Sequence, residues 1–489
     1  MKKSSFWMSA VGALGLAIML AGCGKTFYFA GRTLPPSGLT NRVMVAIQNS
    51  GAGGKGTLEI LDGYYDVRYK YNNVAQTFSI AGYSGSMPIS IQNMPEEQIG
   101  YVYGAGDGSF TPINYEKESS SAAQTGLNGA SASVFITRNQ SSIFAANQST
   151  HVFTVIDRGA GSTFPLSLPG VYRTSVNTGG TVAMAFAQNS NFAYYAVNLN
   201  AAETLAAAGG PANWPKAAVD CEPQTNPQWC LFQVQSPDSV DPRFNGTNGL
   251  PILYFGTPTV FDRPVKAMFS NDGGTAYILN CGAECGGTAS SISILPVGPM
   301  IFKPNQQSGK LPATGTMTTI PMSGGASNAL IASSTMYVVG QQLKPDGLFA
   351  GNLTEVNLSN NTAGAPVAIS DGAPGGVSRI TVADDNTLWV AMTKCTNGER
   401  YAKGQPYGCL TMYNTANHAV SMIEPYQGDA TGVAAVTSLH KVYVAQGGQV
   451  YIFSTRDGSS LNNQYVTVTG TAYDVAYMDG LSDANNTTY

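Results

Sequence analysis

The stretch VKAMFSNDGGTAYIL, from Val265 to Leu279, holds two runs of alternating apolar residues on either side of the polar turn NDGG. Side chains that alternate with a period of two lie on opposite faces of a strand, and Asn, Asp and Gly are favoured in tight turns. The stretch therefore predicts an antiparallel β-hairpin whose second strand carries an aromatic residue near its centre. It decides the fold because the chain repeats it.

The other copies of this pattern lie at Ser133–Ala146, Thr181–Val197, Ser378–Met392 and Gly432–Ala445. The copy at Thr181–Val197 follows the pattern most loosely. A third strand follows most copies, at His151–Asp157, Ser290–Val297, Asn352–Leu358, Cys409–Asn414 and Gln449–Thr455. A fourth strand often closes the unit. Four strands in each repeat of roughly 40 to 60 residues are typical of β-propeller blades. The sequence therefore predicts an all-β fold with a single propeller.

The two ends of the chain predict how the ring closes. Thr471–Asp479 has the pattern of an innermost strand with no partners after it, whereas Arg42–Asp62 has the pattern of second and third strands without an inner one. Pairing these ends completes one blade and leaves no open sheet edge. Inner strands are expected near residues 88, 132, 182, 266, 327, 379, 433 and 473, which gives eight four-stranded blades. Seven blades are the alternative, because the copies near 88 and 182 are the weakest.

Three short motifs fall at set places in this repeat: Asp272-Gly273 in the first turn, Tyr443-Val444 in the second strand and Asp157 at the end of a third strand. In this the repeat resembles that of the YVTN-type bacterial β-propellers, which are similar to lactonases and quinoprotein-like enzymes. The resemblance covers most of the chain. It implies a propeller over residues 42–479, followed by a tail at 480–489. It also implies an alternative function, namely an enzyme that acts at the mouth of the central channel.

The N-terminal stretch LAGCGKT, Leu20 to Thr26, ends like a phosphate-binding loop. That reading fails because Met19 stands where the loop requires a glycine, and no helical pattern follows Thr26. The stretch instead follows two lysines and an apolar run, Phe6 to Leu20, that is too short to span a membrane. This order is typical of an export signal.

Leu20-Ala21-Gly22-Cys23 resembles the bacterial lipobox, in which signal peptidase cuts before a cysteine that carries a diacylglycerol. The resemblance implies a signal peptide at residues 1–22 and a lipidated linker at 23–41. It also implies a thioether-linked diacylglyceryl group and an amide-linked third acyl chain, such as palmitate, on Cys23. Two or more chains give a stable membrane anchor. Gly24, rather than aspartate, resembles the pattern for delivery to the outer membrane of the cell envelope. The alternative is a plain secretory peptide with an accidental cysteine.

The charge of the chain is low and nearly balanced. Charged residues make up 11% of it, and the formal net charge is −4. Binding to nucleic-acid phosphates requires a basic stripe, so the composition argues against a nucleic-acid partner.

Six cysteines remain besides Cys23, and an even number in an exported protein is typical of disulfides. Six cysteines allow about fifteen pairings. The closeness of the residues along the chain favours Cys221–Cys230, Cys281–Cys285 and Cys395–Cys409. A metal site is the competing interpretation, but His151, His418 and His440 all lie far from the cysteine pairs in sequence. Apart from the covalent lipid, the sequence predicts no metal and no cofactor.

Long insertions are expected in the connections from second to third strands, at residues 198–228, 280–289, 341–351 and 393–408. These connections lie on one face of a propeller, and all three expected disulfides lie in or beside them. Braced loops gathered on one face predict a binding surface, although they also fit a merely decorated rim. Aromatic residues and arginine are enriched where binding energy concentrates. The candidate contact residues are Trp214, Trp229, Arg400, Tyr401, Lys403 and Tyr407.

Three charged residues, Lys266, Arg379 and Asp474, occupy equivalent places at the start of inner strands. They are expected near the channel mouth on the insertion-bearing face, where they would receive a polar or anionic ligand. Solvated charges in a water-filled channel are the alternative.

Familiar catalytic motifs are missing. Residues 51–56 match G-x-G-x-x-G, but no helix follows to hold a phosphate, and there is neither G-x-S-x-G nor H-E-x-x-H. The sequence therefore favours a lipid-anchored, non-enzymatic propeller that binds a protein or glycan partner. A channel-mouth enzyme is the first alternative and a self-associating surface-layer component the second.

Overall fold

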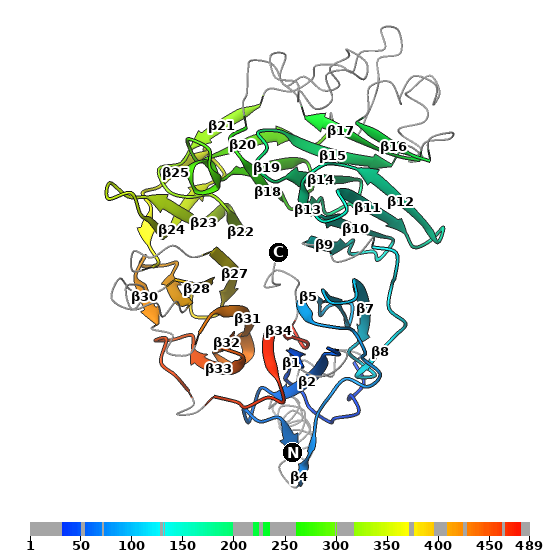
Figure 1. Cartoon of the computed structure of the whole chain (residues 1–489). Helices are drawn as coiled ribbons and strands as arrows, with labels where there is room; N and C mark the ends of the chain where they lie inside the picture. The colour runs from blue at the N-terminus through cyan, green and yellow to red at the C-terminus, as the bar shows by residue number, and fades with distance from the viewer. Residues whose placement is uncertain are drawn as a thin grey trace, which may run out of the picture.

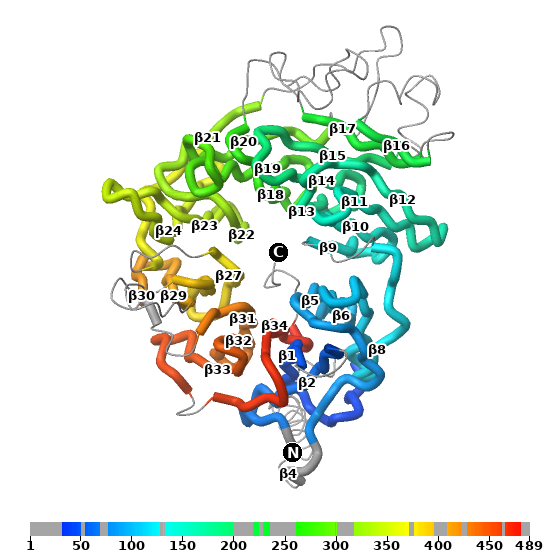
Figure 2. The backbone as a smooth tube through the Cα atoms, in the orientation of Figure 1, coloured from blue at the N-terminus to red at the C-terminus, as the bar shows by residue number. Residues whose placement is uncertain are grey.

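The protein is described from a computed structural model that covers residues 32–49, 54–70, 73–127, 131, 133–198, 219–223, 228–234, 261–298, 300, 317–370, 376–395, 408–423, 428–461 and 465–480. Its strands form small antiparallel sheets arranged radially around a central channel (Figures 1 and 2). Eight of the sheets are the blades of one β-propeller, so the predicted fold is confirmed and the alternative of seven blades is wrong. No helix of the described part is both long and apolar enough to cross a membrane.

The first four blades follow one another along the chain. In each blade the first strand named lies next to the channel and the last lies at the rim. Blade 1 contains β5 (Pro88–Met94), β6 (Ile99–Gly104), β7 (Ser109–Asn114) and β8 (Ser119–Ser120). Blade 2 contains β9 (Ser133–Ile136), β10 (Ser142–Asn147), β11 (Val152–Asp157) and β12 (Ser162–Ser167). Blade 3 contains β13 (Val171–Val176), β14 (Val182–Ala187), β15 (Ala193–Asn198), β17 (Trp229–Val234) and β16 (Asp220–Glu222). Blade 4 contains β18 (Pro264–Phe269), β19 (Thr275–Asn280), β20 (Ser291–Pro296) and β21 (Thr318–Pro321).

The next three blades continue the ring. Blade 5 contains β22 (Asn328–Ala332), β23 (Thr335–Leu343) and β24 (Phe349–Asn357), which pairs both β25 (Thr362–Ala363) and β26 (Val367–Ala368). Blade 6 contains β27 (Gly376–Ala383), β28 (Thr387–Thr393), β29 (Cys409–Asn414) and β30 (Val420–Ile423). Blade 7 contains β31 (Ala430–Val436), β32 (Lys441–Gln446) and β33 (Gln449–Ser454). The short 3₁₀ helices η3 (Gly282–Cys285) and η4 (Thr437–Leu439) lie in blades 4 and 7.

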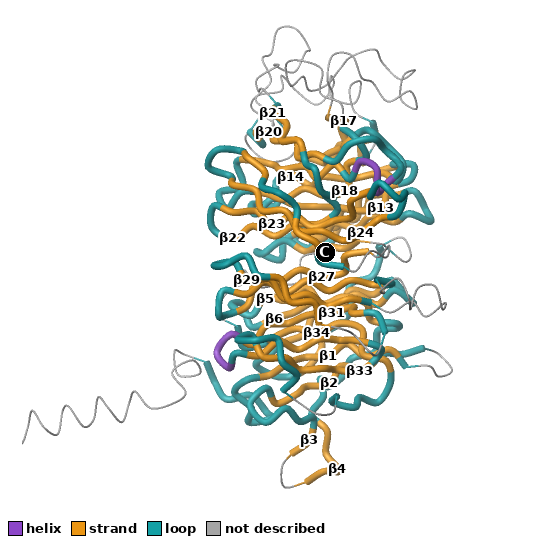
Figure 3. The backbone as a smooth tube through the Cα atoms, turned by 90° about the vertical axis from the view of Figure 1, so that its left-hand side faces the viewer, coloured by secondary structure: helices purple, strands orange, loops and turns teal. Residues whose placement is uncertain are grey.

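Blade 8 is built from both ends of the chain, as predicted. Its inner strand β34 (Thr471–Tyr477) pairs antiparallel with β1 (Arg42–Gln48), which in turn pairs with β2 (Thr57–Asp62). The first and last strands therefore satisfy each other's backbone hydrogen bonds and seal the ring. The small hairpin of β3 (Tyr69–Lys70) and β4 (Asn73–Thr77) projects from the rim beside this blade (Figure 3).

A buried ion cluster reinforces the closure. The Arg42 guanidinium lies 2.7 Å from Asp479 Oδ1 at the C-terminal end and 3.0 Å from Glu118 Oε1 in blade 1. The Arg42 backbone N–H also donates to Asp479 Oδ2, at 2.7 Å. Arg42 is 0% exposed, and both carboxylates are buried. One side chain thus joins the first strand, the end of the last strand and the neighbouring blade.

The core consists of apolar layers between adjacent blades, and the central aromatic of the second strand is part of these layers. The layers bury three aromatics of second strands, Phe144, Trp389 and Tyr443. In blade 3 the corresponding buried aromatic, Tyr195, lies on the third strand. Second and third strands are covered on both faces by neighbouring blades, which explains their almost continuous burial. The Trp389 indole N–H still finds an acceptor, Thr387 Oγ1, at 3.1 Å.

The predicted strand order of blade 3 is wrong. Val182–Ala187 is the second strand, and the inner strand is β13, Val171–Val176. The second strand VAMAFA is buried along its whole length, whereas the inner strand VYRTSV carries polar side chains. Residues 198–228 therefore connect a third strand to the fourth, and this connection leaves from the opposite face to the one predicted. The other three insertions do join second to third strands.

All three predicted disulfides are present. Cys221 and Cys230 face each other across β16 and β17, with Cα atoms 4.1 Å apart. Cys281–Cys285 closes the η3 turn, and Cys395–Cys409 joins the start of one insertion, just after β28, to the first residue of β29. Each bond restrains the chain where a long connection leaves or enters a blade. Residues 1–31, which include Cys23, and the tail from 481 lie outside the described residues.

Candidate functional site

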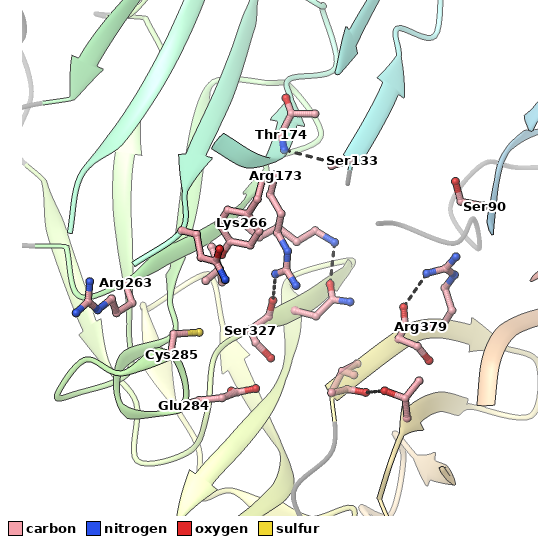
Figure 4. Close-up of a pocket in the computed structure, with 18 of the residues that line it drawn as sticks. Ser90, Ser133, Arg173, Thr174, Arg263, Lys266, Glu284, Cys285, Ser327 and Arg379 are labelled. Carbon is pink, nitrogen blue, oxygen red and sulfur yellow. Dashed lines mark hydrogen bonds between the residues drawn. The ribbon is translucent and has the colours of Figure 1, made fainter. Parts of the chain in front are cut away.

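A cavity of about 540 Å³ opens at the mouth of the central channel. It lies on the face that carries the second-to-third-strand insertions, which we call the insertion face; the opposite face, with the tight first turns, is the turn face. Side chains from several inner strands and from η3 converge on it (Figure 4). The polar residues in the wall of this cavity include Arg173, Lys266, Glu284, Ser327, Asn328 and Arg379.

A shared backbone feature places the charged residues. Six inner strands shift register by one residue near their start, in the manner of a β-bulge. A bulge inserts one unpaired residue and re-aims the side chains beside it, so the residue after each bulge reaches the same level of the channel. The residues at this position are Ser90, Arg173, Lys266, Arg379, Gly432 and Asp474.

The predicted equivalence of Lys266, Arg379 and Asp474 is therefore confirmed, and Lys266 and Arg379 line the cavity. Arg173 is the fourth charged residue of this set, and sequence reasoning missed it because the inner strand of blade 3 was assigned to the wrong segment. The signal was available: VYRTSV aligns with PVKAMF, so that Arg173 falls on Lys266.

Lys266 lies deepest among these cations. Its side chain is buried, and Nζ donates a hydrogen bond to the Asn328 amide oxygen at 2.7 Å. Burial lowers the pKa of Lys266 well below its usual value, and the nearby Arg173 and Arg379 guanidinium groups lower it further. No carboxylate of the described residues lies within ion-pair distance of this amine.

Arg379 of blade 6 and Asp474 of blade 8 form a buried ion pair. Arg379 Nη2 lies 3.1 Å from Asp474 Oδ2, and that same oxygen accepts the Ile91 backbone N–H at 2.9 Å. Asp474 is 0% exposed, and burial raises its pKa despite the guanidinium. Gly432 makes room for it, because a Cβ at this position would lie 2.6 Å from Asp474 Oδ1. Asp474 therefore stands behind Arg379 and positions it.

Glu284 reaches the mouth from η3, the turn that the Cys281–Cys285 disulfide closes. Its carboxylate accepts the Gln341 backbone N–H at 2.8 Å, so the turn of blade 4 is docked on blade 5. Burial raises the pKa of Glu284, although this hydrogen bond and the Arg173 charge act against the shift. Arg173 itself donates to the Ser327 carbonyl at 3.3 Å. A basic and an acidic group thus face the same cavity.

A second cavity, of about 390 Å³, opens on the turn face. Both cavities are lined by Ser133, Val134, Thr174 and Lys266, so these residues mark the waist between the two halves of the channel. The turn-face half is the more apolar one, with Phe135, Val176, Met268, Phe269, Leu330 and Ile331 in its wall.

The predicted contact residues are only partly tested. Trp214, Arg400, Tyr401, Lys403 and Tyr407 lie outside the described residues. Trp229 is 2% exposed and packs edge-on against Phe144, with ring centroids 5.6 Å apart. The prediction of Trp229 as a surface contact is therefore wrong, because β17 continues the blade and its tryptophan fills the layer between blades 2 and 3.

The turn face also brings together Asp384, Asp385 and His440, whose ligand atoms lie within 4.8 Å of one another. The two aspartates lie in the tight turn between β27 and β28, and the left-handed backbone of Asp385 suits a turn residue. His440 Nδ1 lies 2.8 Å from Asp385 Oδ2, and Thr455 also donates to this carboxylate. His440 Nδ1 also lies 2.8 Å from Asp384 Oδ2.

Comparison with known proteins gives the fold. No protein-family model and no curated protein matches the sequence. A dihydro-heme d1 dehydrogenase solved in complex with DHE aligns with a TM-score of 0.52 at 10% identity, over 91% of this chain and 76% of that one. Hydrazine synthase of Kuenenia stuttgartiensis aligns at 15% identity over 75% and 93% of the two chains, with a TM-score of 0.44. The periplasmic gluconolactonase of Pseudomonas aeruginosa aligns at 13% identity over 89% and 98%, with a TM-score of 0.41. At these identities the likeness reaches only to the architecture, and this chain is a β-propeller.

Proposed function

We propose that the protein is an exported, lipid-anchored β-propeller that binds a carboxylate-bearing ligand, a sugar acid or the end of an acidic glycan, in the insertion-face cavity. One observation carries the proposal: Arg173, Lys266 and Arg379 come from three different blades to one cavity. The carboxylates nearby are already engaged, since Glu284 accepts a backbone N–H and Asp474 lies behind Arg379. The cavity lining contains three arginines, Arg173, Arg263 and Arg379, and these outnumber the two carboxylates even where Lys266 is neutral.

The chemistry of the remaining wall suits such a ligand. Guanidinium groups bind carboxylates through charge-assisted hydrogen bonds. The hydroxyl groups of Ser90, Ser133 and Ser327 add partners for sugar hydroxyls, and Tyr172 contributes an aromatic ring. The volume of about 540 Å³ falls within the range of small-molecule sites.

The lipid anchor is proposed from the LAGC motif at Leu20–Cys23. It would hold the propeller on a membrane of the cell envelope, with the outer membrane favoured by Gly24. We expect the mature protein to carry acyl mass on its N-terminal peptide and Cys23→Ala to lack it, as mass spectrometry of the protein from a bacterial host would show. An unacylated N-terminal peptide in the unsubstituted protein would contradict the anchor.

Isothermal titration calorimetry with digalacturonate tests the binding function. We expect Arg173→Gln and Arg379→Gln each to weaken the affinity by about 10- to 100-fold, since a hydrogen bond to a charged group contributes about 1.5–3 kcal/mol. Arg456→Gln, at an exposed position outside the cavity, is the matched control and is expected to bind as the unsubstituted protein does. Equal affinity for a neutral disaccharide, or unchanged affinity in both cavity variants, would overturn the proposal.

Catalysis at the same mouth is the second candidate, and Glu284 favours it. Burial raises the pKa of its carboxyl group, which is the direction that a general acid requires. Opening a lactone would release an acid that the neighbouring cations hold. Release of acid from glucono-δ-lactone in a pH-stat, faster than the uncatalysed hydrolysis and returned to that background rate by Glu284→Gln, would assign the cavity to hydrolysis instead of binding alone.

A further inference from the structure

Lys266 is the one charged residue whose side chain lines both halves of the channel, among the described residues. It extends into the waist, where its amine is hydrogen-bonded to the neutral amide of Asn328, at 2.7 Å (Figure 4). Buried lysines normally pair with a carboxylate, because an unpaired buried charge is costly. This lysine has a neutral partner where the two cavities meet.

The groups that face Lys266 oppose its protonation. Arg173 on β13 and Arg379 on β27 are both close enough to disfavour a further positive charge. The two carboxylates of the mouth are held elsewhere: Glu284 accepts the Gln341 N–H, and Asp474 accepts from Arg379. Burial adds to the effect, so the pKa of Lys266 falls well below the usual range of an amine. Lysines next to other cations are activated in this way as nucleophiles.

We propose that Lys266 captures a carbonyl-bearing acid of the 2-oxo acid class as a reversible imine, while the Arg173 and Arg379 guanidinium groups hold its carboxylate. The inference rests on the proposed function for the carboxylate subsite and deepens it, because it names the functional group next to the carboxylate. The arrangement fits because a 2-oxo acid carries its ketone on the carbon beside the carboxylate, and the amine lies between the two cations.

The step is balanced without any other reactant. The lone pair of the neutral Nζ attacks the ketone carbon, a C–N bond forms as the C–O π bond breaks, and the oxygen takes up one of the two amine protons. The carbinolamine then loses this oxygen as water together with the remaining amine proton, which leaves a C=N bond. The net change is amine plus ketone to imine plus water, and hydrolysis reverses it.

Reductive trapping tests the inference. The purified mature protein is incubated with pyruvate and sodium cyanoborohydride near neutral pH, and modified lysines are located by peptide mass spectrometry. We expect the reduced pyruvyl group on Lys266 at least about tenfold faster than on the exposed Lys117, because the neutral fraction of an amine rises tenfold for each tenfold fall in its basicity. As the pH is raised toward about 10, the rate at Lys117 is expected to approach that at Lys266.

Two comparisons make the outcome decisive. Lys266→Met, with its fold checked by circular dichroism, is expected to lose the rapid labelling, and lactate, which has the carboxylate without the ketone, is expected to slow it. Labelling of Lys266 no faster than of Lys117 would overturn the inference, even where digalacturonate still binds and the proposed function stands. Rapid labelling that neither lactate nor digalacturonate slows would show that the amine is reactive. It would overturn the proposal that the two guanidinium groups hold a carboxylate beside it.

Discussion

Arg42→Met is expected to lower the free energy of unfolding by about 3–5 kcal/mol, because it leaves two buried carboxylates without their shared cation. Asp479 and Glu118 are 3% and 6% exposed, and both lie within 3.0 Å of the Arg42 guanidinium. The lost ion pairs are ones that hold the ring closed, because Arg42 begins the first strand and Asp479 follows the last. The change is measured as a shift of the urea unfolding curve.

Two variants accompany this test. Arg42→Lys keeps the charge but lacks the planar fork, so we expect an intermediate loss. Arg138→Met removes a cation whose pairs with Glu96 and Glu97 lie in the solvent-exposed part of the surface, and it is expected to cost about 1 kcal/mol or less. If Arg42→Met is no more destabilised than Arg138→Met, strand pairing and the apolar layers alone close the ring.

Asp474→Ala is expected to destabilise the protein by about 3–5 kcal/mol and also to weaken binding of digalacturonate. The buried Arg379 would lose the carboxylate 3.1 Å from it, and the Ile91 N–H would lose its acceptor. Because Asp474 positions Arg379 without facing the cavity itself, its loss should affect affinity in the same direction as Arg379→Gln but less strongly. Urea unfolding and calorimetry on the same preparation measure both effects.

Asp346→Ala is the matched control for this prediction. Asp346 lies in an exposed turn, where its carboxylate accepts the Leu348 N–H at 2.9 Å, and its loss should cost less than about 1 kcal/mol without changing affinity. A double-mutant cycle of Asp474→Ala with Arg379→Gln isolates the pair. Strictly additive losses would show that the two residues act independently, contrary to the geometry.

The fold could be predicted because its signals are local. Alternation in segments such as Val265–Leu279 sets which side chains are buried, and the turn residues set where each hairpin ends. The incomplete strand sets at the two ends predicted closure, since an unpaired strand at either end would leave an open edge. The disulfides were predictable for the same reason, as each joins cysteines close along the chain.

Blade 3 shows where this reasoning fails. The inner strand VYRTSV lines the central channel, so it carries Arg173, Thr174 and Ser175 and looks less like a strand than its neighbours do. The second strand VAMAFA is covered by blades on both sides and is apolar throughout. The sequence pattern therefore led to Val182–Ala187 being predicted as the inner strand instead of Val171–Val176. The same error hid Arg173 and misplaced the connection at residues 198–228.

The sequence by itself determined most of the hairpins, the count of eight blades, the closure and the disulfides, because strand alternation and turn formation depend on residues close along the chain. Only the tertiary structure decided which charges meet. Arg173, Lys266, Glu284 and Arg379 come together because the ring brings separate inner strands to one channel and a bulge sets each side chain at the same level. Trp229 was assigned to the surface for the same reason: its burial depends on a neighbouring blade.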